Sequence, residues 1–406
     1  MDFLFWGFYF PLIKVLTFIL SPIPKVRERI AFERRNDWQG FLKTGEKADL
    51  AFEFSSEGEY QQAASLIQDS LEAGKKIEIV YFSPSVEKAM TDLAGKYPLQ
   101  LKVLRYPLLT LSLSHSFSHW ITSDTLVLVR YDFLPEFLVW SRKPHHKLNI
   151  LWVSFKKDRL KGRKPSFYKM LFLNRATKLF FASHQEASFG KILNLSGDVY
   201  DFRIEQIHRR ILSRLEKYAQ SFVLYPDLMK KLSPIRVIMG NAWVSDLALI
   251  RNIPKHISCL IVPHRLDLIP DFKETLKSMN LGFQEITIDT TEIEDKQIYI
   301  LNRKGLLCEL YHDFDKAYVG GGFEKSVHSL LEPLVAGSKQ ISCGPQNHRS
   351  TEFDLAQDLG HLKEIHTPQD FLHWLESDAV KPDVLALQSI LKQYSRMKEE
   401  LVHVKE

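Results

Sequence analysis

The chain alternates between short apolar runs and longer amphipathic stretches along most of its length. Runs such as Ile79–Phe82, which reads IVYF, and Cys259–Val262, which reads CLIV, are apolar at every position. Unbroken runs of this kind are typical of strands that are buried on both faces of a parallel sheet. Between the runs lie stretches such as Gly58–Ala73, where apolar residues recur at helical spacing. The pattern therefore predicts an α/β protein.

The strand-like runs form two successive series, and each series is long enough for one domain. The first series comprises Ala48–Phe54, Lys76–Phe82, Leu101–Tyr106, Thr125–Tyr131, Asn149–Phe155 and Lys178–Ala182. The second comprises Ile235–Met239, Ser258–Val262, Ile298–Leu301, Lys316–Val319 and Lys339–Ser342. The join is expected near Tyr225–Pro234, which interrupts both series. We expect two doubly wound, Rossmann-like domains, at residues 23–225 and 235–382, facing a central cleft, and a C-terminal helix within 383–406.

The first 22 residues differ from this pattern, because they are apolar with little interruption. Between Phe3 and Leu20 the only charged side chain is that of Lys14, and a basic cluster follows at Lys25–Arg35. Such a segment is typical of a membrane anchor whose flanking cations stay on the cytoplasmic side. Residues 1–22 are therefore expected to span the membrane or to lie in its interface. The alternative is an apolar helix docked on the protein's own core or on a partner.

Composition is that of a folded, soluble body. The chain has 406 residues, 45% of them hydrophobic and 25% charged, and its 54 basic and 49 acidic residues leave a net charge of +5. These values exclude a disordered chain, a collagen-like repeat and a polytopic membrane protein. The three cysteines are too few and too scattered for a disulfide framework or a structural zinc site, which indicates a reducing compartment.

The first candidate site follows the run Leu50–Phe54 and opens the helix expected after it. Ser56, Gly58 and Glu59 lie there, at a helix N-terminus that would suit an anion or an ionised carboxylate. Ser56 followed three residues later by Glu59 is also the signature of a capping box. From spacing alone, Glu59 is either a structural cap or a site carboxylate.

The second candidate site is the glycine triplet in Val319–Phe323, which follows another strand-like run. Consecutive glycines let the backbone approach a ligand and can form a phosphate-binding nest, although a tight turn is the simpler interpretation. His328 and Glu332 follow about one helical turn apart, and a carboxylate there would suit a ribose diol.

Other candidates are cationic. Pro263, His264 and Arg265 end a strand-like run and offer donors to a phosphate or carboxylate, although a lone histidine can equally be a turn residue. The basic run Lys156–Lys169, which contains Lys161 and Arg163, would suit a nucleic acid, a solvated loop or an anionic lipid surface. No Walker A loop, nucleophile elbow or metal-ligand spacing occurs in the sequence, so neither a metal nor a cofactor is expected.

These motifs together resemble the Kdo transferases, which are GT-B glycosyltransferases that move 3-deoxy-D-manno-octulosonic acid (Kdo) from CMP-Kdo to a lipid A precursor. The resemblance rests on the apolar N-terminus with its basic segment and on four motifs spread over most of the chain. Those motifs are Ser56–Glu59, Gly240–Trp243, Pro263–Arg265 and the stretch from Val319 to Pro345 with its Gly-Gly-Gly-Phe and Leu331-Glu332-Pro333. Val129–Phe133 is similar to the family's acceptor-side segment with an acidic residue, here Asp132.

The resemblance implies a role for each matched residue. Glu59 would be the catalytic base of an inverting, metal-independent transfer, in an acceptor-binding first domain. Acceptor or anion binding would fall to Ser56, Gly58, Asp132, Lys161 and Arg163. The second domain would bind CMP-Kdo through Gly240, Pro263, His264, Arg265, Gly321, Gly322, His328 and Glu332.

The sequence also departs from the family pattern at the donor site. Ser329 stands where the family usually has asparagine, and Asn241-Ala242 replaces Ser-Thr in the Gly-Ser-Thr-Trp motif. These departures leave open a transferase that uses another nucleotide sugar, or a homologue without activity. The partners implied are CMP-Kdo, a lipid A precursor and an anionic membrane surface, with no nucleic acid. The place implied is the cytoplasmic face of the inner membrane of a Gram-negative-type bacterium.

Overall fold

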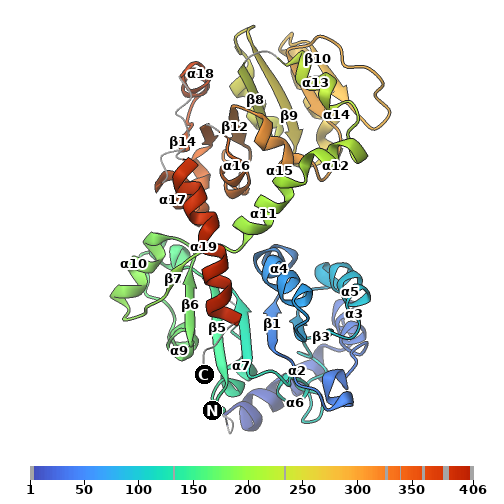
Figure 1. Cartoon of the computed structure of the whole chain (residues 1–406), viewed down its shortest axis with the longest axis vertical. Coiled ribbons are helices and arrows are strands. Elements are labelled where there is room, and N and C mark those ends of the chain that lie inside the picture. Colours follow the sequence, from blue (N-terminus) through green and yellow to red (C-terminus); the bar gives the residue numbers. More distant parts are fainter. Residues whose placement is uncertain are drawn as a thin grey trace. The chain divides into compact units, whose positions relative to one another are not determined.

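The chain folds into two compact α/β units (Figure 1). The computed structural model describes residues 4–130, 133–232, 235–324, 328–338, 340–358, 362–377 and 384–402. The first unit comprises Met1–Arg203 and Ser395–Glu406, and the second comprises Ile204–Tyr394. Each unit is built around a parallel sheet of seven strands, so the predicted α/β class with two parallel-sheet domains is confirmed.

The sheet of the first unit has the order β3-β2-β1-β4-β5-β6-β7. Its strands are β1 (Leu50–Phe54), β2 (Ile77–Tyr81), β3 (Leu101–Arg105), β4 (Thr125–Val129), β5 (Lys147–Val153), β6 (Lys178–Phe181) and β7 (Asp198–Val199). Its helices are α3 (Pro24–Glu33), α4 (Glu57–Glu72), α5 (Glu87–Lys96), α6 (Phe117–Trp120), α7 (Pro135–Trp140), α8 (Lys156–Leu160), α9 (Phe167–Arg175) and α10 (His184–Ile192). The strand order reverses between β1 and β4, as in a doubly wound fold.

The sheet of the second unit has the order β10-β11-β9-β8-β12-β13-β14, and its order reverses between β8 and β12. Its strands are β8 (Ile235–Ala242), β9 (Ile257–Pro263), β10 (Phe283–Ile286), β11 (Ile298–Leu301), β12 (Lys316–Val319), β13 (Gln340–Cys343) and β14 (Leu362–Glu364). Its helices are α11 (Arg203–Leu212), α12 (Arg214–Ser221), α13 (Tyr225–Lys231), α14 (Ile269–Ser278), α15 (Leu307–Leu310), α16 (Leu331–Ala336), α17 (Thr351–Asp358) and α18 (Pro368–Glu376).

Burial explains why the strands read as unbroken apolar runs. Along β9, Leu260 belongs to one hydrophobic cluster of the second unit, whereas Cys259 and Ile261 belong to another. Successive side chains of a strand point to opposite faces, so the two clusters lie on the two faces of the sheet. A strand covered on both faces is therefore apolar at most of its positions. β7, β10 and β14 are the strands that the apolar pattern did not predict.

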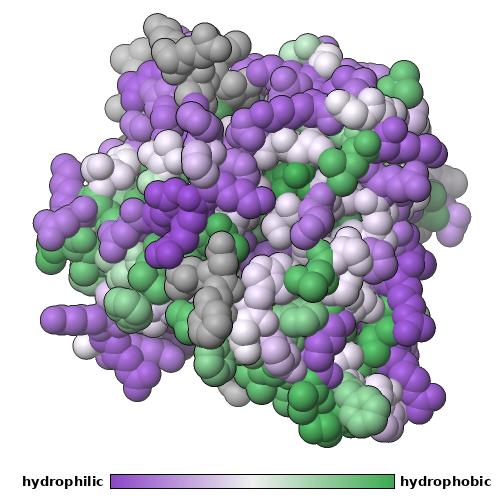
Figure 2. All heavy atoms as spheres, turned by 90° about the horizontal axis from the view of Figure 1, so that it is seen from below, coloured by the Kyte–Doolittle hydropathy of each residue, from purple (hydrophilic) through white to green (hydrophobic). Residues whose placement is uncertain are grey.

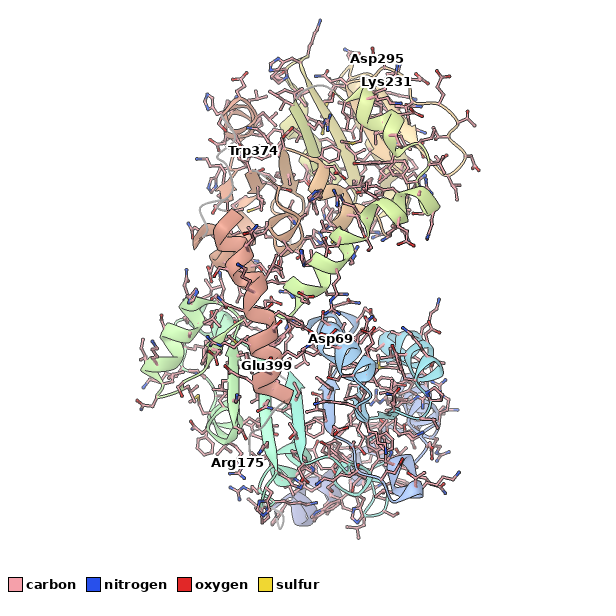
Figure 3. All side chains as sticks on the ribbon, viewed as in Figure 1. Asp69, Arg175, Lys231, Asp295, Trp374 and Glu399 are labelled. Carbon is pink, nitrogen blue, oxygen red and sulfur yellow. The ribbon has the colours of Figure 1, made fainter. Side chains whose placement is uncertain are left out.

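The units divide at Arg203–Ile204, earlier along the chain than the join expected near Tyr225–Pro234. Ile207, Tyr218 and Leu228, from α11, α12 and α13, pack into the cluster that contains Leu260 of β9. These helices therefore belong to the core of the second unit. The predicted C-terminal helix is α19 (Val384–Val402), and its last residues belong to the first unit, where Lys398 pairs with Asp69 of α4 at 3.0 Å. Figure 3 labels Asp69 and the residue after Lys398, Glu399.

The apolar N-terminal segment forms a π-helical turn, η1 (Phe5–Tyr9), followed by α2 (Phe10–Leu20). Phe5 is 2% exposed and packs with Leu111 and Val139, so the start of the segment docks on the core of the first unit. No side chain of α2 is buried, and Phe18 is 82% exposed. No helix within the described residues combines the length and the apolar character needed to cross a membrane.

Candidate functional site

In each unit some of the predicted site residues lie where the strand order reverses. In open α/β sheets, ligands bind outside the carboxyl ends of the strands at such a switch point. In the first unit the flanking strands are β1, followed by Ser55–Glu59, and β4, followed by Arg130. In the second they are β8, which ends in Gly240–Ala242, and β12, followed by Gly320. Both units thus present sequence-predicted residues at the edge where an α/β sheet binds its ligand.

Glu59 lies in the first turn of α4, with its carboxylate turned back toward the end of β1. Its Oε2 accepts a hydrogen bond of 2.8 Å from the backbone N–H of Ser55, and its side chain is 12% exposed. Ser56 is the N-cap residue in an extended conformation, but its hydroxyl accepts no capping hydrogen bond. The reciprocal capping box that the spacing suggested is therefore not formed. What remains is a fixed, partly accessible carboxylate.

Arg130 is a site residue that the sequence analysis did not single out. Its guanidinium Nη1 lies 3.9 Å from Oε1 of Glu59, and its backbone has a φ of 72°, which is rare for a residue with a side chain. The guanidinium also stacks on Trp152 of β5, 4.0 Å from the ring centroid. The available signal was its place directly after a central strand at the switch point.

The other predicted acceptor residues have mixed outcomes. Asp132 lies outside the described residues. A Cβ added to Gly58 would meet no atom within 4 Å, so the backbone there borders open space. Lys161 and Arg163 are exposed in the loop between α8 and α9, and neither side chain forms an ion pair with a described residue. The structure brings Glu59 and Arg130 together and records no contact of Lys161 or Arg163 with either.

The glycines of the second unit mainly allow the protein's own segments to approach one another. A Cβ on Gly240 would lie 2.0 Å from the hydroxyl of Tyr311, and one on Gly320 would lie 2.4 Å from the carbonyl oxygen of Asn241. A Cβ on Gly322 would lie 2.5 Å from the backbone of Gly344. The family motif at Val319–Pro345 thus reflects close packing of the β12 and β13 ends.

Two amides of the glycine triplet are already used within the protein. The N–H of Gly320 donates to the Gly240 carbonyl at 2.8 Å, and the N–H of Gly321 donates to Oδ2 of Asp246 at 3.3 Å. Gly321 has a φ of 83°, which favours glycine at that position. The amides of Gly320 and Gly321 thus already have partners within the protein, and donor binding by Gly321 and Gly322 stays a prediction.

Asp246 ties the two ends of the switch point together. Its side chain is buried and accepts hydrogen bonds from the Trp243 N–H at 2.8 Å, the Tyr318 hydroxyl at 2.7 Å and the Gly321 N–H. Burial raises the pKa of Asp246, and the hydrogen bonds oppose that rise. One carboxylate therefore fixes the backbone after β8 and the backbone after β12.

Three aromatic rings stack beside this carboxylate. Trp243 stacks on His264 with ring centroids 5.1 Å apart, and His264 lies 4.2 Å from His328. The indole Nε1–H of Trp243 donates to Nε2 of His328 at 3.3 Å. Burial lowers the pKa of His328 to about 4, helped by His264, and burial also lowers the pKa of His264. Both pKa values lie below that of an ordinary histidine, so both imidazoles are mainly neutral at pH 7, and donor binding by His264 stays a prediction.

The remaining donor-site predictions are placed as follows. Pro263 is the buried last residue of β9, next to Ala242 of β8. Arg265 is exposed and forms an ion pair with Asp267, which raises the pKa of Arg265. Glu332 lies in the first turn of α16. Its carboxylate is 4.0 Å from Arg210, which itself forms an ion pair with Glu309 at 3.0 Å.

The departure at Ser329 has a structural role in this chain. Its hydroxyl donates to Oε2 of Glu352 at 3.0 Å, and the same oxygen accepts the N–H groups of Leu330 and Leu331 at 2.7 and 3.1 Å. Glu352 thus satisfies amides at the start of α16 and holds the segment that carries His328. The sequence analysis had not assigned Glu352 this role.

Comparison with known proteins identifies relatives of low identity. No family model matches the chain. The bifunctional glycosyltransferase/methyltransferase of Fusobacterium nucleatum is 22% identical over 358 residues, which are 83% of this chain and 49% of that protein. The 3-deoxy-D-manno-octulosonic acid transferase of Chlamydia muridarum is 26% identical over 156 residues, 36% of this chain and 35% of that protein. The chain thus spans less than half the length of these curated relatives. Because relatives with the name of a Kdo transferase are among them, the resemblance to the Kdo transferases is confirmed.

Solved structures with a similar fold cover nearly the whole chain. The UDP-GlcNAc 2-epimerase of Neisseria meningitidis aligns with 88% of this chain and 94% of its own, at 11% identity and a TM-score of 0.52. MurG of Acinetobacter baumannii aligns with 87% of this chain and 98% of its own, at 10% identity and a TM-score of 0.50. These likenesses establish the fold and leave the reaction to the site residues.

Proposed function

We propose that this relative of the Kdo transferases is an inverting, metal-independent glycosyltransferase that moves Kdo from CMP-Kdo to a lipid A precursor. The observation that carries the proposal is the placement of Glu59. It is a fixed and partly accessible carboxylate at the switch point of the first sheet, beside Arg130. The Kdo transferases among its relatives support the choice of donor and acceptor.

Glu59 would act as the general base of the transfer. Its carboxylate accepts the proton of the acceptor hydroxyl while that oxygen attacks the anomeric carbon of Kdo. The bond from that carbon to the CMP phosphate breaks on the opposite face, so the anomeric configuration inverts. The Ser55 N–H bonded to Oε2 fixes the orientation of the carboxylate during this step.

The second unit would hold the nucleotide by hydrogen bonds rather than by histidine charge. His264 and His328 lie ring against ring, and their lowered pKa values leave both imidazoles mainly neutral, with one N–H on each ring. A neutral donor in a partly buried site can stabilise the phosphate oxygens of departing CMP without a counter-charge. Glu332 would accept hydrogen bonds from the ribose hydroxyls, as an acidic residue does in other nucleotide-binding α/β folds.

The N-terminal segment would hold the protein at the inner membrane, on its cytoplasmic face. Large exposed apolar side chains follow one another along η1 and α2. They are Leu4, Phe8, Leu12, Val15, Leu16, Phe18, Ile19 and Leu20. Figure 2 views the molecule from the side on which α2 lies in Figure 1 and shows hydrophobic side chains gathered in the lower half of that face. An apolar face of this kind beside a basic segment suits insertion into the interface of an anionic bilayer.

The test is a product assay with CMP-Kdo and a tetraacylated lipid A precursor, read by mass spectrometry. Glu59→Gln should lower turnover by about 10²–10⁴-fold, because the proton acceptor is lost. CMP binding, measured by calorimetry, should not change. Glu57→Gln is the matched control, since Glu57 is exposed, lies one residue before Gly58 and accepts a hydrogen bond from Gln61 across one turn.

Other outcomes identify the alternatives. Product from a UDP-sugar but not from CMP-Kdo would identify a transferase with another donor. Intact CMP binding without any transfer would identify a homologue that has lost activity. Full turnover of Glu59→Gln would overturn the assignment of the base.

A further inference from the structure

The surroundings of Arg130 contain backbone strain in two contacting residues. Arg130 has a φ of 72° and Trp152 a φ of 57°, and both values are unusual for residues with a side chain. The pairing of β5 with β6 shifts register between Ile150 and Val153, so Trp152 lies in a bulge. The N–H of Arg130 donates to the carbonyl of Leu151 at 3.1 Å, which fixes the first strained residue beside the second. Strain of this kind persists where the surrounding structure holds it, and it concentrates at functional sites.

The bulge aims the indole of Trp152 at two arginines. Its ring lies 4.0 Å from the guanidinium of Arg130 and 5.8 Å from that of Arg203. The indole Nε1–H donates to Oδ2 of Asp201 at 3.2 Å, and Trp152 is only 9% exposed. A buried ring held at its N–H end provides a fixed plane on which a guanidinium can stack.

The two arginines differ in how far their charge is satisfied. The Arg203 guanidinium donates to both carboxylate oxygens of Asp201, through Nε and Nη2, and so forms a two-point ion pair. Among the residues that the structure describes, Arg130 is paired with the carboxylate of Glu59 at 3.9 Å, which is beyond hydrogen-bond distance. Within the described residues none accepts a hydrogen bond from the Arg130 guanidinium, whose Nε is buried and unsatisfied. Its side chain remains 33% exposed, so a ligand can reach it.

We propose that Arg130 binds an acidic group of the acceptor, a phosphate or a carboxylate, and so places the acceptor hydroxyl at Glu59. The planar fork of a stacked arginine matches both kinds of oxyanion by paired hydrogen bonds. A phosphate would come from the sugar backbone of the acceptor, and a carboxylate from a Kdo residue that the acceptor already carries. This proposal rests on the proposed function, because it names the acceptor chemistry of the same site.

The first experiment measures binding without turnover, using the full chain and no donor. Calorimetry compares three deacylated glucosamine disaccharides: one with its phosphates, one without them, and one without phosphates that carries a Kdo residue. We expect the disaccharide that has neither phosphate nor Kdo to have a Kd at least about tenfold higher than that of the tighter-binding acidic disaccharide. Which acidic form binds more tightly identifies the source of the charge. Equal affinity for all three would overturn the proposal.

The second experiment asks whether Arg130 carries that preference. Arg130→Gln should abolish the preference for the acidic disaccharide, and Arg130→Lys, which keeps the charge but loses the fork, should retain part of it. Arg142→Gln, an exposed arginine of the same unit, is the matched control and should behave like the unchanged protein. If Arg130→Gln kept the full preference, or weakened all three ligands equally, Arg130 would only position Glu59.

The failure of this proposal can be told from the failure of the proposed function. If no nucleotide sugar gave product, the proposed function would fail, yet the binding preference and its loss in Arg130→Gln would still be measurable. If product formed normally and KM for acidic and neutral acceptors rose equally in Arg130→Gln, only the proposal for Arg130 would fall. The urea midpoint of each variant shows whether the fold is intact.

Discussion

The indole N–H of Trp243 points at Nε2 of His328, 3.3 Å away. Because Nε2 accepts this hydrogen bond, it carries no proton, and the proton of the neutral ring is on Nδ1. A charged His328 would carry a proton on both nitrogens and would lose this bond. Trp243 therefore selects one tautomer of His328, the one with its proton on Nδ1.

Trp243→Phe should raise the pKa of His328 from its lowered position toward the ordinary value. The phenyl ring keeps the stack on His264 but removes the N–H, so Nε2 becomes free to take a proton. The shift is measured from the histidine ring ¹⁵N signals in a pH titration. Trp38→Phe is the matched control, because Trp38 stacks on His115 at 4.7 Å in the other unit. An unchanged His328 titration would contradict the assigned tautomer.

Acid should destabilise the second unit through His328. Its pKa is about 4 in the folded chain and near 6.5 when unfolded. Between these values the unfolded state binds the proton and the folded state does not, so stability falls as the pH drops from about 6.5 to about 4. As the pH is lowered through this range, the urea midpoint of His328→Gln should fall less steeply than that of the unchanged protein. Identical slopes in the two proteins would show that His328 is not the titrating group.

Asp246→Asn should destabilise the second unit by about 1–3 kcal/mol and weaken CMP binding. The two backbone N–H groups share Oδ2 and the Tyr318 hydroxyl faces Oδ1, so an asparagine can keep both N–H groups only if its amide nitrogen donates to the Tyr318 oxygen, and all three hydrogen bonds then lose the carboxylate charge. Tyr318→Phe, which removes a single donor, should cost about 1 kcal/mol. Urea unfolding and calorimetry measure both effects. If the two variants lost equal free energy of unfolding, Asp246 would contribute no more than its hydrogen bond with Tyr318.

Gly322→Ala should disrupt the donor site, although it adds only one methyl group. The added Cβ would meet backbone atoms of Gly344 at 2.5 Å, and backbone cannot move aside as a flexible side chain can. We expect a lower unfolding midpoint and weaker CMP binding. Gly282→Ala is the control, because a Cβ there meets nothing within 4 Å. If Gly322→Ala bound CMP normally, the close approach of the two loops would not matter for the nucleotide.

Phe18→Ser and Ile19→Ser should each weaken binding to vesicles of anionic phospholipid by about tenfold. Both side chains are more than half exposed on α2, so their removal should cost little stability in solution. Ile288→Ser is the control, since Ile288 is 77% exposed and belongs to the second unit. Co-sedimentation with vesicles measures the binding. A loss of binding in Ile288→Ser of the same size would contradict a membrane face confined to α2.

The strands were predictable because each carries its own signal. A strand buried on both faces is apolar at most positions, and β9 and β12 follow this rule except at Ser258 and Lys316. β7 has two residues and β14 is not fully buried, so neither strand had an apolar run to reveal it. The unit boundary was missed because the apolar faces of α11 and α12 do not show which sheet they cover.

The site was predictable in part for a similar reason. Glu59, His264 and His328 lie in short motifs that a sequence displays directly. Arg130, Asp246 and Glu352 act through partners distant in the chain, such as Trp152, Tyr318 and Ser329. Sequence spacing holds no record of those contacts.

The sequence by itself determined the α/β class, most of the strands, the apolar N-terminus and the motifs that resemble the Kdo transferases. Each of these follows from local periodicity or from residues close together in the chain. Only the tertiary structure decided that Glu59 bonds Ser55 rather than completing a capping box, and that the glycines admit neighbouring backbone. It also decided that the histidines are neutral, because burial and stacking, which set their pKa, arise only when distant segments pack together.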